Sequence, residues 1–240
     1  MNGTTAEAAK KAATLVKICG IKEETTIDGM KGLPVDYIGF VFAKSKRQVT
    51  PERAAELISA ASRTQMAGEA PPQTVGVFVN PTLEELERAL SVAKLDVVQL
   101  HGEETPAFAR QVADRFGVKV WRALPIVESA GDPVGAVEPE GAGPARLEAY
   151  RGIAEAILID TAGGGTGKTF RWDLIPGYQE AAAANGLKLF VAGGLSPDNV
   201  DGLVEQYSPE GVDISSGVET DGVKDNAKIA AFAQKVRSKS

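Results

Sequence analysis

The only cysteine of the chain follows a lysine near the end of an apolar run at residues 15–21. Lys17 and Cys19 stand two positions apart, so in a strand their side chains lie on the same face. An ammonium group beside a thiol favours the thiolate. Cys19 could therefore act as a general base or a nucleophile, although a lone cysteine can equally be a buried, inert core residue.

A carboxyl group ends a second apolar run, at residues 156–160. Asp160 shares a strand face with Leu158, so its side chain should emerge where the strand ends. A carboxyl on an apolar wall tends to have a raised pKa, which suits a general acid. The alternative is an aspartate that caps a helix or closes a turn before the glycine-rich segment 161–170.

Two apolar runs near the C-terminus end in small residues. Residues 189–195 end in Ala-Gly-Gly-Leu, and residues 212–219 read Val-Asp-Ile-Ser-Ser-Gly-Val-Glu. Each run is followed by a segment that starts a helix. Such endings expose backbone N–H groups, and a helix N-terminus adds partial positive charge. The two runs together predict a site for a phosphate group.

Three further polar residues lie near expected strand ends. Gln99 and His101 share a face of the run 97–102 and could line the opening of a barrel, although His101 could equally be a hydrogen-bonded core residue. Asp213 lies on the last run, which should adjoin the first, where it can pair with Lys17.

Arg47 lies in the polar loop 43–49. A guanidinium in that place could bind a substrate carboxylate through two parallel hydrogen bonds. A solvated basic loop explains the same residues equally well.

The segment 163–169, Gly-Gly-Gly-Thr-Gly-Lys-Thr, invites comparison with a P-loop. That motif needs two glycines five positions apart, the second directly before Lys-Thr. Gly167 fills the second place, but Ala162 stands at the first. We therefore reject a nucleoside triphosphatase and expect a mobile lid over the site.

Eight short apolar runs alternate with helical stretches along the chain. Unalternated Val, Ile, Leu and Phe are typical of parallel strands buried on both faces. Eight units in one domain predict an α/β fold with a single (β/α)8 TIM barrel, with a doubly wound sheet as the alternative. The runs are residues 15–21, 37–42, 75–79, 97–102, 119–124, 156–160, 189–195 and 211–216.

Local signals complete the outline of the domain. Asn80 is a favourable N-cap residue, and proline is common at the first position of a helix. The pair Asn80-Pro81 therefore predicts that a helix starts there. Residues 1–14 are expected to be an N-terminal extension, and residues 15–240 the barrel. Residues 129–144, with many Gly and Pro, are expected to form a surface insertion.

The composition narrows the classes of function. With 26 Lys and Arg against 32 Asp and Glu, the net charge of the 240 residues is −6, which disfavours nucleic-acid binding. One cysteine and one histidine exclude an internal disulfide and leave a zinc site without ligands. No apolar segment suggests a secretion signal or a membrane span. We expect a cytoplasmic monomer that binds a small molecule, with no metal, no cofactor and no membrane partner.

Six motifs occur in order at the ends of the expected strands. They are residues 16–20, residues 39–42 with 45–47, residues 98–102, residues 158–160 with 165–172, residues 192–195, and residues 213–219. Together they resemble phosphoribosylanthranilate isomerase over residues 16 to about 236.

The resemblance implies a metal-free Amadori rearrangement in tryptophan biosynthesis. N-(5-phosphoribosyl)anthranilate would become 1-(2-carboxyphenylamino)-1-deoxyribulose 5-phosphate. In the family pattern Asp160 is the general acid, which protonates the furanose ring oxygen and opens the ring to a Schiff-base cation. Cys19 is the general base, which removes the C2 proton to give an enolamine that tautomerises to the ketone.

The resemblance also implies which residues bind the substrate. Arg47 would hold the anthranilate carboxylate. Supporting contacts would come from Lys17, Gln99, His101 and Asp213. The phosphate would be held largely by backbone N–H groups of Gly193, Gly194, Ser215, Ser216 and Gly217.

Other classes of protein fit the sequence less well. Metal-dependent phosphosugar epimerases need several His and Asp ligands, and this chain has one histidine. The related ProFAR isomerase uses two aspartates, and Cys19 stands where the first would be. A catalytically inactive phosphosugar-binding barrel is disfavoured because both candidate catalytic groups are present.

Overall fold

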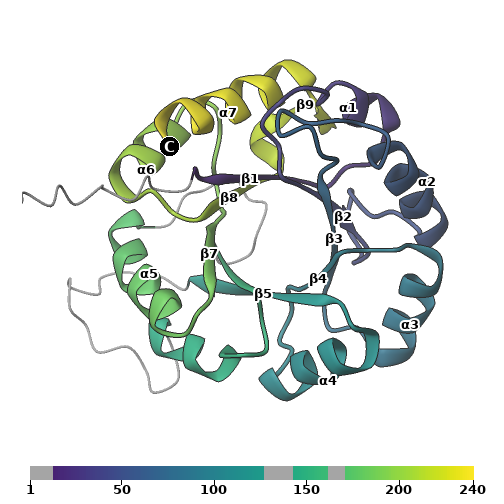
Figure 1. Cartoon of the computed structure of the whole chain (residues 1–240), viewed down its shortest axis with the longest axis vertical. Helices are drawn as coiled ribbons and strands as arrows, with labels where there is room; N and C mark the ends of the chain where they lie inside the picture. Colours follow the sequence, from purple (N-terminus) through teal and green to yellow (C-terminus); the bar gives the residue numbers. More distant parts are fainter. Residues whose placement is uncertain (1–12, 127–142, 162–170) are drawn as a thin grey trace, which may run out of the picture.

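Eight parallel strands close into a barrel in the order β1 to β8, and helices surround it (Figure 1). The computed structural model describes residues 13–126, 143–161 and 171–240. The predicted (β/α)8 barrel is confirmed, and the doubly wound alternative is wrong. The strands are β1 Leu15–Cys19, β2 Tyr37–Val41, β3 Gln73–Phe78, β4 Val97–Leu100, β5 Lys119–Ile126, β6 Ala156–Thr161, β7 Lys188–Val191 and β8 Gly211–Ile214.

The helices follow the strands along the chain and pack on the outside of the barrel. Three short 3₁₀ helices, Gly143–Tyr150, Trp172–Leu174 and Ser216–Val218, supplement them within the described residues. The α-helices are α1 Glu24–Asp28, α2 Pro51–Ala61, α3 Leu83–Val92, α4 Pro106–Phe116, α5 Ile175–Ala184, α6 Val200–Tyr207 and α7 Asn226–Lys239.

Helix α3 begins later than the sequence predicts. Its cap is Thr82, whose hydroxyl accepts a hydrogen bond from the N–H of Glu85, while the Glu85 carboxylate accepts one from the N–H of Thr82. Asn80 instead has a left-handed backbone, with φ of 47°. Its N–H donates to Glu104, so the expected start at Asn80 and Pro81 is wrong.

The lower half of the barrel is filled by apolar side chains. Tyr37, Trp121 and Phe190 pack there with ring centroids 4.4–5.8 Å apart. Smaller residues such as Val75, Val97 and Leu158 complete this inner cluster. Because the floor is occupied, polar groups inside the barrel can meet solvent only towards the carboxyl ends of the strands.

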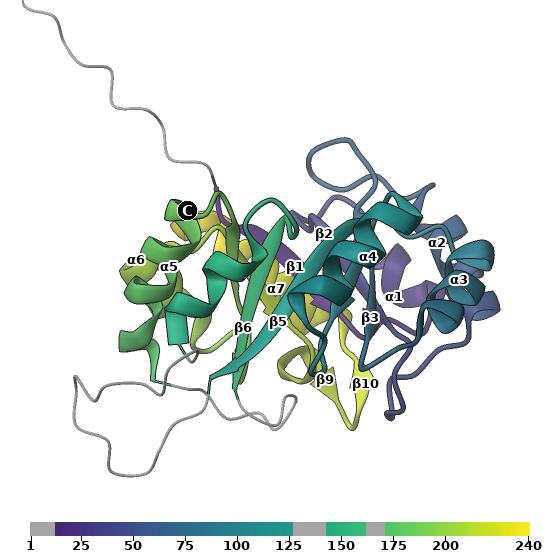
Figure 2. The same cartoon turned by 90° about the horizontal axis from the view of Figure 1, so that it is seen from below.

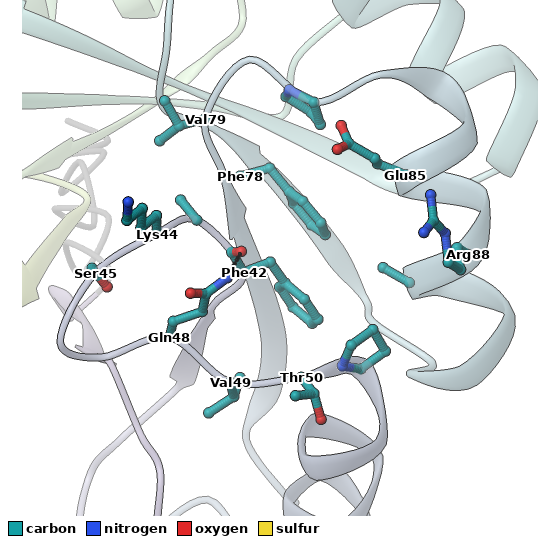
Figure 3. Close-up of a pocket in the computed structure, with 14 residues that line it drawn as sticks. Phe42, Lys44, Ser45, Gln48, Val49, Thr50, Phe78, Val79, Glu85 and Arg88 are labelled. Carbon is teal, nitrogen blue, oxygen red and sulfur yellow. Dashed lines mark hydrogen bonds between the residues drawn. The ribbon is translucent and has the colours of Figure 1, made fainter.

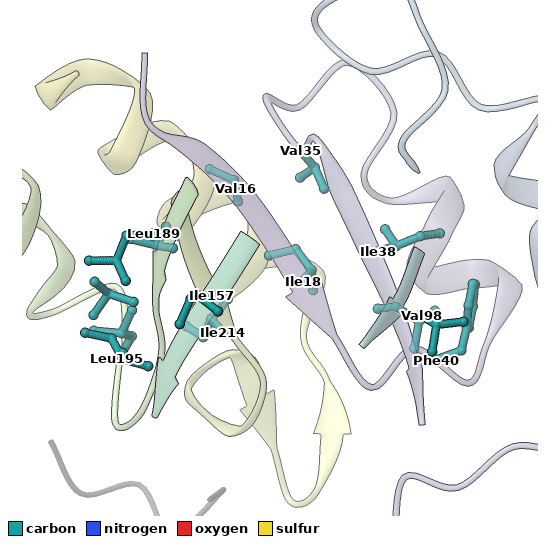
Figure 4. Packing of buried hydrophobic residues seen from close by; sticks show 14 of the residues in the cluster. Val16, Ile18, Val35, Ile38, Phe40, Val98, Ile157, Leu189, Leu195 and Ile214 are labelled. Atoms are coloured by element: carbon teal, nitrogen blue, oxygen red, sulfur yellow. The ribbon is translucent and has the colours of Figure 1, made fainter. Parts of the chain in front are cut away.

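A larger apolar core lies between the barrel and the helices (Figure 4). Neighbouring residues on a strand alternate between the two cores. In β1, for example, Val16 and Ile18 face the helices and are fully buried. That alternation directs Lys17 and Cys19 into the barrel.

A small hairpin follows β8 and was not expected from the sequence. Strands β9 Glu219–Thr220 and β10 Val223–Lys224 pair in antiparallel fashion. Figure 2 shows the hairpin projecting at one end of the barrel, beyond the end of β8. It therefore stands at the rim where the expected site lies.

Several sequence-based predictions lie wholly or partly outside the described residues. Residues 1–12 of the expected extension and 162–170 of the expected lid are among them. Most of the expected insertion, residues 129–142, also lies outside the described residues. Its last two residues, 143 and 144, begin a 3₁₀ helix. In the described part of the chain, no helix is both long enough and apolar enough to span a membrane.

Candidate active site

A buried ion pair connects the first and last strands inside the barrel. Lys17 Nζ lies 2.9 Å from Asp213 Oδ1, and the two residues are in register on β1 and β8. The predicted pairing is confirmed. Lys17 has no exposed surface. Burial by itself would lower its pKa, but the neighbouring Asp213 and Cys19 raise it above the ordinary value.

Cys19 ends β1 next to this pair and is 7% exposed. A Cβ on the neighbouring Gly39 would lie 2.8 Å from Cys19 Sγ, so only glycine leaves room for the sulfur without a shift. Burial raises the pKa of the Cys19 thiol, although Lys17 acts to lower it. Lys17 thus acts on the thiol in the expected direction, while the loss of solvation acts more strongly in the opposite one.

Asp160 is almost buried near the end of β6. Its Oδ1 has no hydrogen-bond partner among the described residues. A Cβ on Gly193 would lie 2.9 Å from that oxygen, so the carboxyl group adjoins the turn after β7. An unpaired buried carboxyl oxygen is costly and is available to a ligand.

Gln99 and His101 form a short chain that ends at Asp160. The amide nitrogen of Gln99 lies 3.0 Å from His101 Nδ1, and His101 Nε2 lies 3.6 Å from Asp160 Oδ2. Gln99 is buried, and its Oε1 has no partner in the described part of the chain. The structure thus places Gln99 of β4 and His101 of the following loop beside the Asp160 carboxylate of β6.

The turn after β7 leaves backbone donors available. Gly193 and Gly194 both have left-handed φ, at 87° and 61°, a conformation that glycine adopts without strain. Within the described residues, neither N–H donates a hydrogen bond. Asn199 holds the turn by donating to the carbonyl of Gly194 at 2.9 Å.

The turn after β8 packs against the turn after β7. A Cβ on Gly217 would lie 1.9 Å from the Leu195 carbonyl oxygen, so the two backbones touch. Ser215 Oγ donates to the carbonyl of Cys19 at 3.1 Å. Ser216 begins the 3₁₀ helix at this point. The five residues expected to hold a phosphate therefore lie on two touching turns, and Ser215 connects one of these turns to Cys19.

Arg47 lies over the end of β1, with its Cδ 2.6 Å from the position of a Cβ on Gly20. Its Nε and Nη2 bind the two oxygens of Glu219 at 2.6 and 3.0 Å. Hydrogen bonds to Glu219 raise the pKa of Arg47, and Glu219 has a pKa lowered to about 2, where bonds to Arg47 and Lys224 outweigh its burial. Half of the guanidinium fork is thus already occupied.

Two residues of the site were missed from the sequence. Glu219 and Lys224 are buried charges on the β9–β10 hairpin. Lys224 Nζ donates to Glu219 and to the carbonyl of Ser215, and burial lowers its pKa despite the carboxylate. The sequence contains only a weak indication of their role. Glu219 belongs to the motif that follows β8, but no local pattern indicates that it contacts Arg47, which lies 172 residues earlier.

One surface hollow is lined by residues that include Phe42, Gln48 and Phe78 (Figure 3). It has a volume of about 820 Å³ and lies between the loops after β2 and β3. Phe42 and Phe78 stack in it with centroids 4.6 Å apart. Its lining includes Lys44 and Ser45 but none of the predicted site residues. Among the described residues no cluster of three His, Cys, Asp or Glu side chains could hold a metal ion.

A closed parallel barrel with ionisable groups gathered at the carboxyl ends of its strands defines a TIM-barrel enzyme. A family model described as N-(5'phosphoribosyl)anthranilate (PRA) isomerase matches residues 16–235. The chain belongs to the phosphoribosylanthranilate isomerase family, and so to the isomerases of tryptophan biosynthesis.

Individual relatives agree with this assignment. The N-(5'-phosphoribosyl)anthranilate isomerase of Brevibacillus brevis is 46% identical over 229 residues, which cover 94% of each chain. The solved phosphoribosyl anthranilate isomerase of Thermotoga maritima matches with a TM-score of 0.73 at 32% identity, over 94% of this chain and 99% of that one. Another solved isomerase, 31% identical with a TM-score of 0.69 over the same shares, is in complex with reduced 1-(o-carboxyphenylamino)-1-deoxyribulose 5-phosphate.

Proposed function

We propose that this chain converts N-(5'-phosphoribosyl)anthranilate to 1-(2-carboxyphenylamino)-1-deoxyribulose 5-phosphate, with Asp160 as general acid and Cys19 as general base. The observation that carries the proposal is the unpaired Oδ1 of Asp160, which adjoins the Gly193 turn. That turn touches the one beside Cys19 through Gly217 and Leu195. An acid, a base and free backbone donors thus gather at one end of the barrel.

Asp160 delivers its proton to the furanose ring oxygen. The C1–O bond breaks, the anilino nitrogen supplies the electron pair, and a Schiff-base cation forms. Cys19 then takes the proton from C2, and the resulting enolamine tautomerises to the ketone. Two groups of different chemistry thus share the two proton transfers.

The charge of the intermediate helps Cys19 to act. Burial raises the pKa of the Cys19 thiol, which disfavours the thiolate. A cationic Schiff base beside the sulfur favours the thiolate, as Lys17 does from below. Lys17 is fully buried and held by Asp213, so its role is to stabilise the thiolate and to fix the base of the site.

The remaining residues bind the two anionic ends of the substrate. The N–H groups of Gly193 and Gly194, with Ser215, Ser216 and Gly217, hold the phosphate. The free edge of Arg47 holds the anthranilate carboxylate, and Gln99 and His101 orient Asp160. The product analogue bound by one solved relative carries both a phosphate and a carboxylate, which supports this division.

The setting of the enzyme is also part of the proposal. We propose that it works in the cytoplasm and as a monomer, with this phosphosugar as its partner. A monomer would differ from the dimeric Thermotoga maritima enzyme. Sedimentation at micromolar protein separates the two states, and a dimer would overturn this part of the proposal.

The decisive experiment compares turnover with binding. Asp160→Asn and Cys19→Ser should each lower kcat about 100- to 10,000-fold, the usual contribution of general acid–base catalysis. Binding of the reduced product analogue should persist in both variants. Arg115→Ala, which removes an ion pair on the outer surface, is the control. Retained turnover in both variants would contradict the assigned roles, and no turnover in the unaltered enzyme would favour a binding protein.

A further inference from the structure

The β9–β10 hairpin contains two buried charges that the proposed mechanism does not use. The side chains of Glu219 and Lys224 are 6% and 5% exposed and lie 3.0 Å apart. Their backbones are directly paired across the hairpin. Burying two charges costs free energy that their mutual attraction alone does not always recover. The contacts that each makes beyond this pair therefore indicate what it does.

Glu219 uses both carboxylate oxygens on Arg47. Its Oε1 accepts from Nε and its Oε2 from Nη2. Two parallel bonds of this kind fix the plane of a guanidinium. Among the described residues, no hydrogen bond engages Nη1 of Arg47. The carboxylate of Glu219 thus leaves one edge of Arg47 available to a second carboxylate, in a fixed orientation.

Lys224 has no donor left for a ligand. Its three N–H groups face Glu219 Oε1 at 3.0 Å, the Ser215 carbonyl at 2.8 Å and Ser215 Oγ at 3.3 Å. It therefore neutralises Glu219 and connects it to the turn after β8. Lys46, at 3.6 Å from Glu219, adds charge at the exposed rim.

We propose that Glu219 is a positioning residue that orients Arg47 for the substrate carboxylate, and that Lys224 joins this pair to the phosphate-binding turn at Ser215. The two anionic ends of the substrate are thereby held at a fixed separation. The assignment deepens the proposed function and depends on Arg47 as the carboxylate ligand.

The test compares two ligands that differ by one group. One is reduced 1-(o-carboxyphenylamino)-1-deoxyribulose 5-phosphate, and the other is the same compound without its carboxyl group. Glu219→Gln keeps the shape of the side chain and removes a negative charge. If charge alone mattered, the carboxylate ligand would bind more tightly. Positioning predicts the opposite sign: the Kd of the carboxylate ligand should rise about tenfold, and that of the other ligand should stay within about twofold.

Lys224→Met tests the connection to Ser215. Because both ligands carry a phosphate, both should bind several-fold more weakly to this variant. Lys239→Met is the matched control, since Lys239 pairs with Glu205 at 2.6 Å on the outer surface. Melting temperatures show whether each variant remains folded.

The outcomes separate the two levels of the proposal. Tighter or unchanged binding of the carboxylate ligand by Glu219→Gln, or equal losses for both ligands, would overturn the positioning role. A loss confined to the carboxylate ligand in Lys224→Met would overturn the connection to the phosphate turn. Failure of the unaltered enzyme to bind either ligand would overturn the proposed function, and this assignment with it.

Discussion

The amide nitrogen of Gln99 faces Nδ1 of His101 at 3.0 Å. When the amide donates, Nδ1 accepts, and the imidazole proton resides on Nε2, which points towards Asp160 Oδ2. Gln99 thereby selects the ring tautomer that can hold the carboxyl group of Asp160 in place.

Gln99→Leu should therefore lower kcat with little change in KM. The expected loss is about fivefold, close to one hydrogen bond. Steady-state kinetics with the phosphoribosylanthranilate substrate measure both constants. Gln179→Leu removes a comparable bond, to the Tyr207 carbonyl, on the outside of the barrel and is the control. A variant with wild-type kcat would mean that the tautomer of His101 does not matter.

Arg47→Ala should act chiefly on KM. Removing the guanidinium removes one ligand of the substrate carboxylate, and we expect a rise of at least about tenfold, near the cost of a hydrogen bond to a charged group. The measurement is a fluorescence assay of freshly made phosphoribosylanthranilate. Arg115→Ala, which breaks an Arg–Glu pair on the outer surface, should leave KM unchanged. An unaltered kcat/KM in Arg47→Ala would remove Arg47 from the site.

Glu219 should make the stability of the fold sensitive to acid. Its pKa in the folded protein is about 2, below the ordinary 4.5, because Arg47 and Lys224 bind the carboxylate. A lowered pKa stabilises the folded state above about pH 4.5, and this contribution is lost as the pH falls towards 2. Urea unfolding at several pH values should show a steeper loss in the wild type than in Glu219→Gln over this window. Parallel curves would mean that Glu219 is solvated in solution.

Gly193→Ala should damage the site as well as the fold. The residue has φ of 87°, and a Cβ would lie 2.3 Å from Thr161 Oγ1 and 2.9 Å from Asp160 Oδ1. Gly117→Ala is the matched control: Gly117 has φ of 63°, but its Cβ would enter open space. Both variants should lose about 1–2 kcal/mol from left-handed strain, but only Gly193→Ala should lose kcat. Equal activity in the two would show that the Asp160 carboxyl tolerates displacement.

The barrel itself was predictable because its strands are buried on both faces and read as apolar runs. The pairing of Lys17 with Asp213 was predictable too, since a closed barrel makes the first and last strands neighbours. Strand-end residues such as Asp160 follow from the same periodicity.

The features that were predicted wrongly or missed depend on contacts between residues that are distant in sequence. The start of α3 was misplaced because Asn80 and Thr82 both resemble caps, and contacts to the next loop decide between them. The effect of burial on the pKa of Cys19 was not considered from the sequence, because neighbouring residues do not reveal how deeply the thiol is buried. Strands of two residues, such as β9 and β10, are too short to show any period.

Because Cys19 is almost enclosed, its thiol can report how accessible the barrel opening is to small molecules. With one cysteine in 240 residues, any thiol reagent that modifies the native protein must have entered the barrel opening. The labelling rate then measures how often that opening admits a small molecule, with no background from other thiols. Saturating the enzyme with a tight ligand should protect it, so occupancy can be followed by mass spectrometry without a coupled assay.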